Sequence, residues 1–319
     1  MRHRKITRNT LSILICAPLS IFAAALLPAQ EAGLDQSPST GIMRFINEPS
    51  NVKITHEFDA KAGYVFPSAT RIEGNKIGNV DEVFSSIDYV LSPEISKDFI
   101  PRFGLQWERY SYGHSTAIPI PNTLQFTAAI LGFDAALNDE WLVRFEAKPG
   151  IYSDFEDVGA SDINVPFILG ASWLVDTDLQ VFAGVSVDLF RQFPVLPGIG
   201  VRWEFADDWT LFFVPPEPRL VYKASDDLEI YAGADILGTS ARVGKSFGSS
   251  VGRPGLNDTV VDLFEIRAGA GLTYKITNSI SANVEGGYMV WREFDYHRAN
   301  FHPRNDPAPY AQLSLSGSF

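Results

Sequence analysis

The sequence predicts an all-β protein, a transmembrane up-and-down antiparallel β-barrel of fourteen strands. Three observations lead to this prediction. Apolar and polar residues alternate with a period of two in segment after segment, short turns of one kind recur along the chain, and a leader-like segment stands at the amino terminus. Such alternation gives each strand one apolar and one polar face. From Asn51 onward no convincing stretch has helical periodicity.

The amino terminus is typical of a secretory signal peptide. Basic residues in MRHRKITR precede the uncharged apolar run LSILICAPLSIFAAALL, which ends near PAQEA. A membrane anchor is the alternative, because about 17 apolar residues approach the length of a spanning helix. Pro18 and the small residues near the end of the run favour cleavage. We therefore expect a signal peptide over residues 1–30, an N-terminal periplasmic segment or plug over 31–51, and the barrel over 52–319.

Charge and cysteine content exclude several classes of protein. The leader takes four basic residues with it, so the 26 Lys and Arg fall to 22 against 38 Asp and Glu, a net charge of −16. A chain with this negative net charge has no electrostatic attraction to nucleic acid. Cys16 is the only cysteine and lies in the leader, where Ile15 before it does not suit lipidation. Export without disulfides excludes the small disulfide-stapled secreted folds.

Fourteen strands follow in chain order, and the turns between them have two lengths. We expect the strands at Val52–Phe66, Val80–Ser92, Phe99–Ser111, Thr123–Leu137, Trp141–Ser153, Asn164–Val175, Leu179–Leu189, Gly198–Phe205, Trp209–Val214, Arg219–Ala224, Leu228–Leu237, Val260–Ile276, Ser279–His297 and Ala308–Phe319. If the two shortest do not form, the count is twelve. Tight turns rich in Asn, Asp and Ser follow the even-numbered strands. Longer links, at residues 67–79, 112–122, 238–259 and 298–307, follow odd-numbered ones, as in outer-membrane barrels.

The two faces of the strands differ in the way that a lipid-facing barrel requires. In Leu179–Leu189, alternate apolar residues oppose Gln180, Gly184, Ser186 and Asp188. In Ser279–His297, an apolar set that includes Tyr288 and Val290 opposes Ser281, Asn283, Glu285, Gly287 and Trp291. Aromatic residues at the strand ends suit an interfacial girdle, namely Trp141, Trp173, Trp203, Phe205 and Trp209. A soluble β-sandwich also alternates, but it needs a second apolar face, and these strands offer none.

Charged residues of both signs fall on the predicted inner face. The lumen-facing candidates are Arg102, Glu108, Arg144, Glu146, Lys148, Arg202, Glu204, Glu229, Asp235, Glu265, Arg267 and Glu285. They could line a polar channel and set its selectivity. Alternatively they pair across strands and fill the lumen. Fourteen strands lie between the eight that side chains can fill and the sixteen that leave an aqueous pore. We therefore expect a narrow or partly plugged pathway, with residues 31–51 as a plug or a free tail.

Candidates for chemistry are few. The barrel region has four histidines, His56, His114, His297 and His302, and no serine in a nucleophile motif. The segment WREFDYHRANFH groups carboxylates with two histidines, but its spacing matches no established metal site. We predict no enzyme activity, no catalytic residues, no metal site and no cofactor.

The last ten residues, YAQLSLSGSF, alternate strictly and end on an aromatic residue. With Leu313, Leu315 and the terminal Phe319, this strand resembles the sorting signal of Gram-negative outer-membrane β-barrels. The resemblance implies an outer-membrane location after export, recognition by the barrel-assembly machinery, and contact with membrane lipid and lipopolysaccharide. A second stretch, PVLPGIGVRWEFADDWTLFFVPPEPRLVYK at residues 194–223, resembles a signature of uncharacterised outer-membrane barrels, a family of unknown function. That resemblance implies a fold and a location in the outer membrane, but no activity.

Two functions remain open on the sequence. The first is a narrow channel or transporter for small solutes, including hydrophobic ones, because the strand count is similar to that of fatty-acid and aromatic-hydrocarbon channels. The second is a non-conducting structural or surface-binding barrel that acts through extracellular loops, such as residues 238–259.

Overall fold

The computed structural model describes residues 53–114 and 118–319, so the predicted signal peptide and the segment 31–51 lie outside the described residues. The strands are β1 (Ile54–Ile72), β2 (Asn75–Pro93), β3 (Phe99–Gly113), β4 (Thr123–Ala136), β5 (Trp141–Ala147), β6 (Gly150–Ser153), β7 (Ile163–Asn164), β8 (Phe167–Leu174), β9 (Leu179–Val187), β10 (Val195–Ala206), β11 (Trp209–Phe213), β12 (Arg219–Lys223), β13 (Leu228–Arg242), β14 (Val260–Thr277), β15 (Ile280–Asp295), β16 (Arg304–Asn305) and β17 (Ala308–Ser318). Helical structure among the described residues is limited to α3 (Phe247–Ser250) and the short 3₁₀ turns η1 (Ala160–Asp162), η2 (Pro254–Leu256) and η3 (His297–Ala299).

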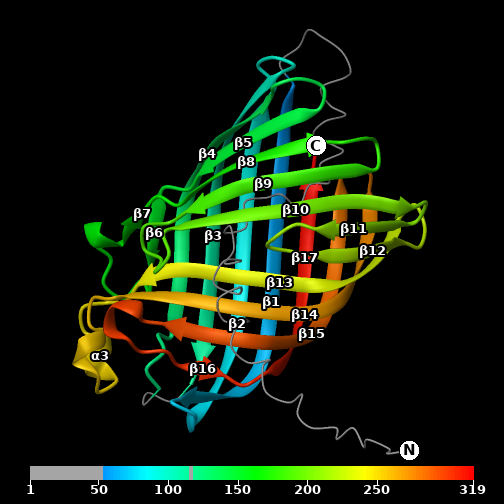
Figure 1. Cartoon of the computed structure of the whole chain (residues 1–319). Coiled ribbons are helices and arrows are strands. Elements are labelled where there is room, and N and C mark those ends of the chain that lie inside the picture. Colours follow the sequence, from blue (N-terminus) through cyan, green and yellow to red (C-terminus); the bar gives the residue numbers. More distant parts are fainter. Residues whose placement is uncertain (1–52, 115–117) are drawn as a thin grey trace, which may run out of the picture.

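These segments make one closed antiparallel barrel of 14 strands (Figure 1), which confirms the predicted fold class. The segments β5 and β6 follow one another along β4 and both pair with it, so together they form one strand of the barrel. In the same way β7 continues into β8, and β16 into β17. The last strand pairs with the first from Glu57↔Ser318 to Val65↔Tyr310, so the sheet has no open edge along this seam.

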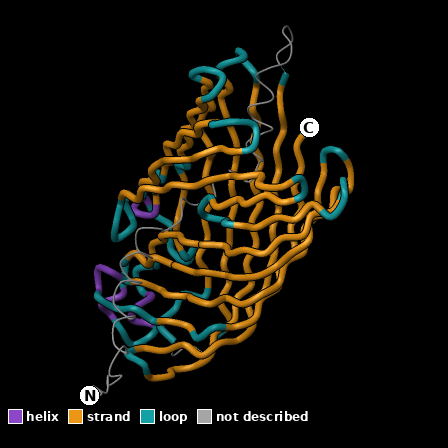
Figure 2. The backbone as a smooth tube through the Cα atoms, turned by 45° about the vertical axis from the view of Figure 1, so that its right-hand side comes forward, coloured by secondary structure: helices purple, strands orange, loops and turns teal. Residues whose placement is uncertain are grey.

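The two ends of the barrel differ as predicted. Tight turns such as Asn138–Glu140 and Ser225–Asp227 lie at the end where the chain finishes, which we call the turn end. In both turns a side-chain oxygen, of Asn138 or Ser225, accepts a backbone N–H two residues on. The helical segments lie at the opposite end (Figure 2), which we call the loop end.

One predicted link is wrong. Residues 67–79 form no loop, because β1 and β2 stay paired from Ile54↔Pro93 to Ile72↔Asn75. The turn between them consists of Glu73 and Gly74, both with positive φ (50° and 83°), the arrangement that favours tight hairpins. Pro67, which has no N–H for a ladder, falls in a register shift between Val65 and Ser68 and so does not break the pairing.

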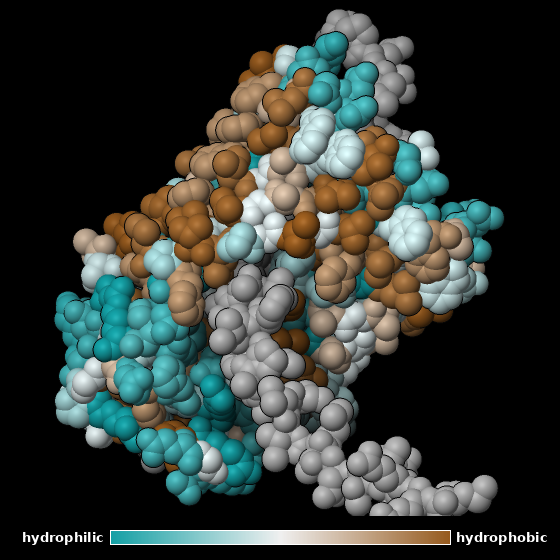
Figure 3. All heavy atoms as spheres, in the orientation of Figure 1, coloured by the Kyte–Doolittle hydropathy of each residue, from teal (hydrophilic) through white to brown (hydrophobic). Residues whose placement is uncertain are grey.

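Exposed apolar residues form a belt on the turn-end half of the outer surface, and on the face that Figure 3 shows the loop end is hydrophilic. Large exposed residues on it include Leu105, Ile199, Leu272, Val284 and Leu313. Aromatic rings border the belt at the turn end, where Trp141 and Trp173 stack with ring centroids 5.8 Å apart. This is the predicted girdle. In the described residues, no helix is long and apolar enough to cross a membrane.

The wall of the barrel is uneven between β10 and β13. The hairpin β11–β12 is the shortest in the sheet, with five residues in each strand. At the loop end Ser153 of β6 instead forms a parallel bridge with Arg242 of β13. The Asp154 amide also donates to the Arg242 carbonyl, at 3.1 Å. The fifth and eleventh strands of the barrel therefore meet directly, past the five shorter strands between them.

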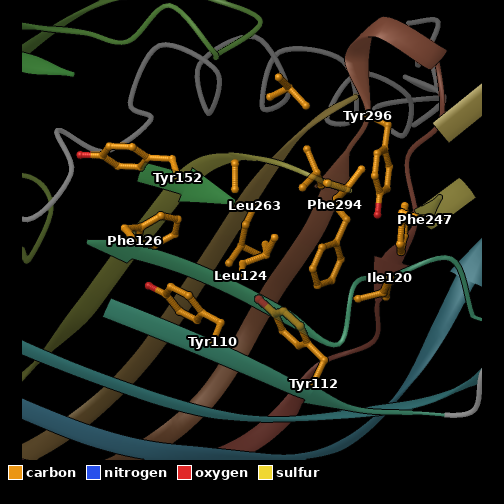
Figure 4. Packing of buried hydrophobic residues seen from close by; sticks show 14 of the residues in the cluster. Tyr110, Tyr112, Ile120, Leu124, Phe126, Tyr152, Phe247, Leu263, Phe294 and Tyr296 are labelled. Carbon is orange, nitrogen blue, oxygen red and sulfur yellow. The ribbon is translucent and has the colours of Figure 1, made fainter. Parts of the chain in front are cut away.

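An apolar core occupies the loop end of the barrel interior (Figure 4). Rings from several strands meet there: Phe126 lies 5.4 Å from Tyr152, and Tyr112 lies 5.0 Å from Phe294. The longest loop contributes Phe247 and Leu256, so it folds onto the core. This loop runs over residues 243–259, shorter than predicted because β13 continues to Arg242.

Candidate functional site

The candidate site is the barrel interior, where nine of the twelve predicted lumen residues are buried. These nine are Arg102, Glu108, Glu146, Lys148, Arg202, Asp235, Glu265, Arg267 and Glu285. Arg144 is largely buried as well. Glu204 and Glu229 lie near the turns and are partly exposed, beside Arg202 and Lys275 respectively. Seven of the nine, all but Glu108 and Arg202, belong to three groups of buried ion pairs.

The first group lies on the inner wall of β1, β3, β4 and β5. Arg102 on β3 contacts Glu57 of β1 at 3.1 Å and Glu146 of β5 at 3.4 Å. Each partner is two strands away, so the side chains reach over the strand between them. Arg144 binds Asp134 at 2.6 Å, and Lys148 lies 3.7 Å from Glu146.

The second group joins opposite parts of the wall through the proline-rich tip of the β11–β12 hairpin. Glu217, in the sequence VPPEP, accepts a hydrogen bond from Lys61 of β1 at 2.9 Å and forms an ion pair with Arg219 at 2.7 Å. Arg219 also lies 3.4 Å from Asp235 and 3.7 Å from Glu285. The carbonyls of Pro216 and Pro218 accept hydrogen bonds from backbone amides of β13. These prolines therefore join the sheet through their carbonyls, although they have no N–H to donate.

The third group is a quartet of charges, Glu82, Glu265, Arg267 and Arg292, at the border of the apolar core. Arg267 contacts Glu82 at 2.6 Å, Arg292 contacts Glu82 at 2.8 Å, and both arginines bind Glu265. All four side chains are at most 1% exposed. The strands β1 and β17 lie between β2 and β15 in the wall. The side chains of the quartet therefore meet across the interior, in front of β1 and β17. Buried charges need such reciprocal pairing, since an unpaired one is costly.

One predicted orientation is wrong, and the error concealed a member of the quartet. Trp291, expected on the inner face, is exposed on the outside. The ladder pairs Ile266 with Trp291 and Arg267 with Met289, so Val290 is a bulge. An extra residue shifts the alternation by one position, which turns Arg292 inward.

Several interior charges did not appear in the predicted set: Glu57, Lys61, Glu82, Asp134, Glu217, Arg219 and Arg292. Strict alternation along β2 and β4 was a sufficient signal for Glu82 and Asp134. Nothing in the sequence marks Glu217, because it lies in an irregular tip where alternation does not apply.

Two loop-end histidines, His297 and His302, lie near carboxylates. His297 Nδ1 is 3.2 Å from Asp262, and His302 Nδ1 is 2.8 Å from Asp295. At the turn end His56 stacks on the terminal Phe319, with centroids 5.4 Å apart. No group of three or more metal-binding side chains occurs in the part of the chain that the structure describes.

Two loop carboxylates have perturbed acidity. Burial raises the pKa of Asp154, although the amides of Gly244 and Glu156 donate to it. Burial also raises the pKa of Asp188, against the opposing effect of Arg191 and the Asn164 amide. Both residues stand where loops meet the wall beside β13.

Comparison with known proteins identifies the family. Residues 115–316, more than half of the chain, match the family described as a domain of unknown function, DUF6268. The chain belongs to the DUF6268 family. This is in keeping with the resemblance seen at residues 194–223. A search among curated proteins gives no match.

Solved structures similar to this DUF6268 barrel include several outer-membrane proteins. The outer membrane channel COG4313 from Pseudomonas putida F1 has 10% identity and a TM-score of 0.43, covering 85% of this chain and 97% of that one. The Pseudomonas putida toluene transporter TodX has 11% identity and a TM-score of 0.38, with 92% and 96% covered. The NanC porin has 12% identity and a TM-score of 0.38, with 82% and 98% covered.

Proposed function

We propose that this DUF6268 protein is an outer-membrane barrel that passes small solutes along a narrow, gated interior pathway. The carrying observation is the quartet of Glu82, Glu265, Arg267 and Arg292. It holds four charges inside a closed barrel of 14 strands, next to the apolar core at the loop end. A barrel of this strand number has room for more than side-chain packing. Charges that pair across the interior, from β2 to β14 and β15, narrow that room.

The surface supports the outer-membrane location. An apolar belt encircles strands that pair without a break along the seam, as a barrel in lipid requires. The tight turns then face the periplasm and the loop end faces outward. Assembly through Phe319 by the barrel-assembly machinery and contact of the loop end with lipopolysaccharide belong to the same proposal.

The quartet predicts a specific electrical behaviour. In Glu82→Gln/Glu265→Gln, two arginines remain without carboxylates, so water should follow them into the loop end and the open lumen should favour anions. In planar bilayers we expect small or rare steps from the wild type and larger, anion-selective steps from the double variant. The matched control is Glu140→Gln/Glu156→Gln, which neutralises two exposed carboxylates and should behave as wild type.

Folding is checked independently by the gel shift between heated and unheated samples. If wild type and double variant both stay at the lipid baseline while the gel shift shows folded barrels, passage through the lumen is excluded. The second candidate, a non-conducting barrel, then takes its place. A variant that lacks residues 31–51 tests the predicted plug in the same recordings. If this segment enters the lumen, its deletion should increase the step size.

A further inference from the structure

We propose that Ser172, Gln180 and Arg202, on the inner wall near the turn end, bind small monocarboxylates that carry an apolar body. The three residues belong to β8, β9 and β10, which are neighbours in the sheet (Figure 1). This inference rests on the proposed function, because it names a substrate class for the interior pathway. Binding is measured without ion flow, so either proposal can fail alone.

Arg202 is a buried interior cation outside the three groups of ion pairs. Its one ion pair among the described residues is with Glu204, two positions along the same strand. That contact uses the Nη2 atom of the guanidinium, and the other N–H groups have no partner in the described chain. A guanidinium has five N–H donors. Arg202 can therefore bind a second acceptor.

Two neighbouring side chains are buried donors without an acceptor. Gln180 is 1% exposed and Ser172 is 6% exposed. Neither the Nε2 atom of Gln180 nor the hydroxyl of Ser172 has a hydrogen-bond partner among the described residues. A buried polar group that stays unpaired costs free energy. Two such groups on adjacent strands indicate a ligand that accepts hydrogen bonds.

The three side chains share the inner face. Trp173 and Trp203, each one position further along its strand, are exposed on the outside, so Ser172 and Arg202 point inward. Gln180 is the ladder partner of Arg202 and therefore lies on the same face.

The register places the three donors within reach of one carboxylate. Direct ladder partners such as Gln180 and Arg202 have Cβ atoms about 5 Å apart, and diagonal neighbours are about 7–8 Å apart. Ser172 is such a diagonal neighbour, because Gln180 pairs with Leu174, two residues further along β8. One ligand oxygen between Gln180 and Arg202 can accept from both, and the second oxygen can accept from Ser172.

The chemistry of the three groups decides the ligand class. Each can donate a hydrogen bond, and none is an acid, so the site favours acceptors over cations. Hydrogen bonds between a cation and a carboxylate are about twice as strong as neutral ones, and the planar guanidinium matches carboxylate geometry. The site has a single cation, which suits a singly charged carboxylate better than a doubly charged phosphate.

Apolar side chains surround the donors. Leu174 opposes Gln180 on β8, and Phe212 opposes Arg202 on β11. Phe182 is the next inward residue along β9, and all three apolar side chains are partly exposed. A few polar groups among partly exposed apolar ones are typical of sites for small molecules with a ring or a short alkyl body.

Glu204 competes with the ligand for Arg202. Its side chain is 42% exposed, so it can leave the guanidinium and enter water at the turn end. A ligand carboxylate that replaces it keeps the charge of Arg202 paired. Removing the charge of Glu204 should therefore strengthen binding, which a purely structural ion pair does not predict.

The first test is equilibrium dialysis of radioactive benzoate against the protein in nanodiscs. We expect saturable binding above empty nanodiscs. Benzamide, a neutral molecule of the same shape, should bind at least about tenfold more weakly. Glu204→Gln should bind benzoate roughly threefold more tightly, the factor expected for a competing ion pair that is partly exposed to water.

Substitutions locate the site. Gln180→Met keeps the volume of the side chain and removes the amide, so it should weaken benzoate binding about tenfold, as for a lost hydrogen bond to a charged group. The matched control is Gln106→Met on β3. Gln106 is 2% exposed, and its amide also has no partner among the described residues, so the same change is made elsewhere on the inner wall. Its benzoate binding should equal that of wild type.

The gel shift confirms that each variant forms a folded barrel. The site is overturned if folded wild type shows no saturable benzoate binding or if benzamide binds as tightly as benzoate. Equal weakening by Gln106→Met and Gln180→Met also overturns it. Conductance separates this failure from failure of the proposed function. Ion steps without benzoate binding leave the channel standing and remove the site, whereas binding without steps does the reverse.

Discussion

Val290 is one residue more than the ladder between β14 and β15 can pair, and its bulge decides what Arg292 does. With it, Arg292 points inward and binds Glu82 and Glu265; without it, Trp291 would take the inward position. A single backbone irregularity thus places Arg292 in the quartet.

Deleting Val290 should therefore disrupt the quartet. We expect the deletion to lower the free energy of unfolding by about 3–5 kcal/mol, the cost of leaving buried charges without a partner. Val290→Ala keeps the bulge and loses little, because Val290 is exposed on the outer surface. Urea unfolding in lipid vesicles, followed by tryptophan fluorescence, compares the two. Equal stability of both variants would show that the bulge does not set the position of Arg292.

The raised pKa of Asp154 predicts that the stability of the folded protein depends on pH. Burial raises the pKa of Asp154 in the folded protein, against the amides that Gly244 and Glu156 donate to it, and the negative charges of Glu156 and Asp162 act in the same direction as burial. A raised carboxyl pKa means that the folded state holds the proton more strongly than the unfolded state. Stability is then greatest below the unfolded value, near pH 4, and falls as pH rises through the folded pKa.

The corresponding experiment compares wild type with Asp154→Asn in urea from pH 4 to pH 8. The wild type should lose stability over this range more steeply than the variant, which cannot titrate at this position. A parallel pH dependence in both proteins would assign the effect to another group.

At the scale of elements, the β1–β2 hairpin depends on its two-residue turn. Gly74 has φ of 83°, a conformation that side chains disfavour, and an added Cβ meets nothing within 4 Å. Any cost of substitution there is therefore backbone strain alone. Gly74→Ala should destabilise by about 1–2 kcal/mol, whereas Glu73→Asn, which tolerates positive φ, should be neutral or stabilising. Urea unfolding measures both, and a neutral Gly74→Ala would mean that the turn takes another form.

The β11–β12 hairpin shows how one short element shapes its surroundings. Because each of its strands has only five residues, β10 and β13 extend beyond it, paired there with β9 and β14 respectively but not with the hairpin. Its tip, with three prolines, turns Glu217 inward to Lys61 instead of extending the ladder. The second group of ion pairs results from this shortness.

At the scale of the whole molecule, the barrel closes where β17 meets β1. His56 and Phe319 exchange backbone hydrogen bonds of 2.8 and 3.0 Å, and their rings stack. Phe319 is itself 61% exposed, so it adds little burial to the folded barrel.

Phe319→Ala should consequently reduce assembly more than stability. In cells we expect a clear drop in the fraction of heat-modifiable protein in the outer membrane, while purified and refolded protein should lose no more than about 1 kcal/mol. Phe58→Ala, next to the same seam, is the matched control for lost aromatic contact. An equal drop in both variants in cells would show that Phe319 matters only as a ring at the seam.

The sequence by itself determined the strands, their number and the two kinds of turn. These depend on local alternation and turn chemistry, which neighbouring residues specify. Only the tertiary structure decided which charges meet, as with Lys61 and Glu217, whose partners lie far apart in the chain. It also decided the bulge at Val290 and the short hairpin that makes the wall uneven between β10 and β13. Each depends on how many residues a neighbouring strand offers for pairing, and this quantity does not exist until the strands are side by side.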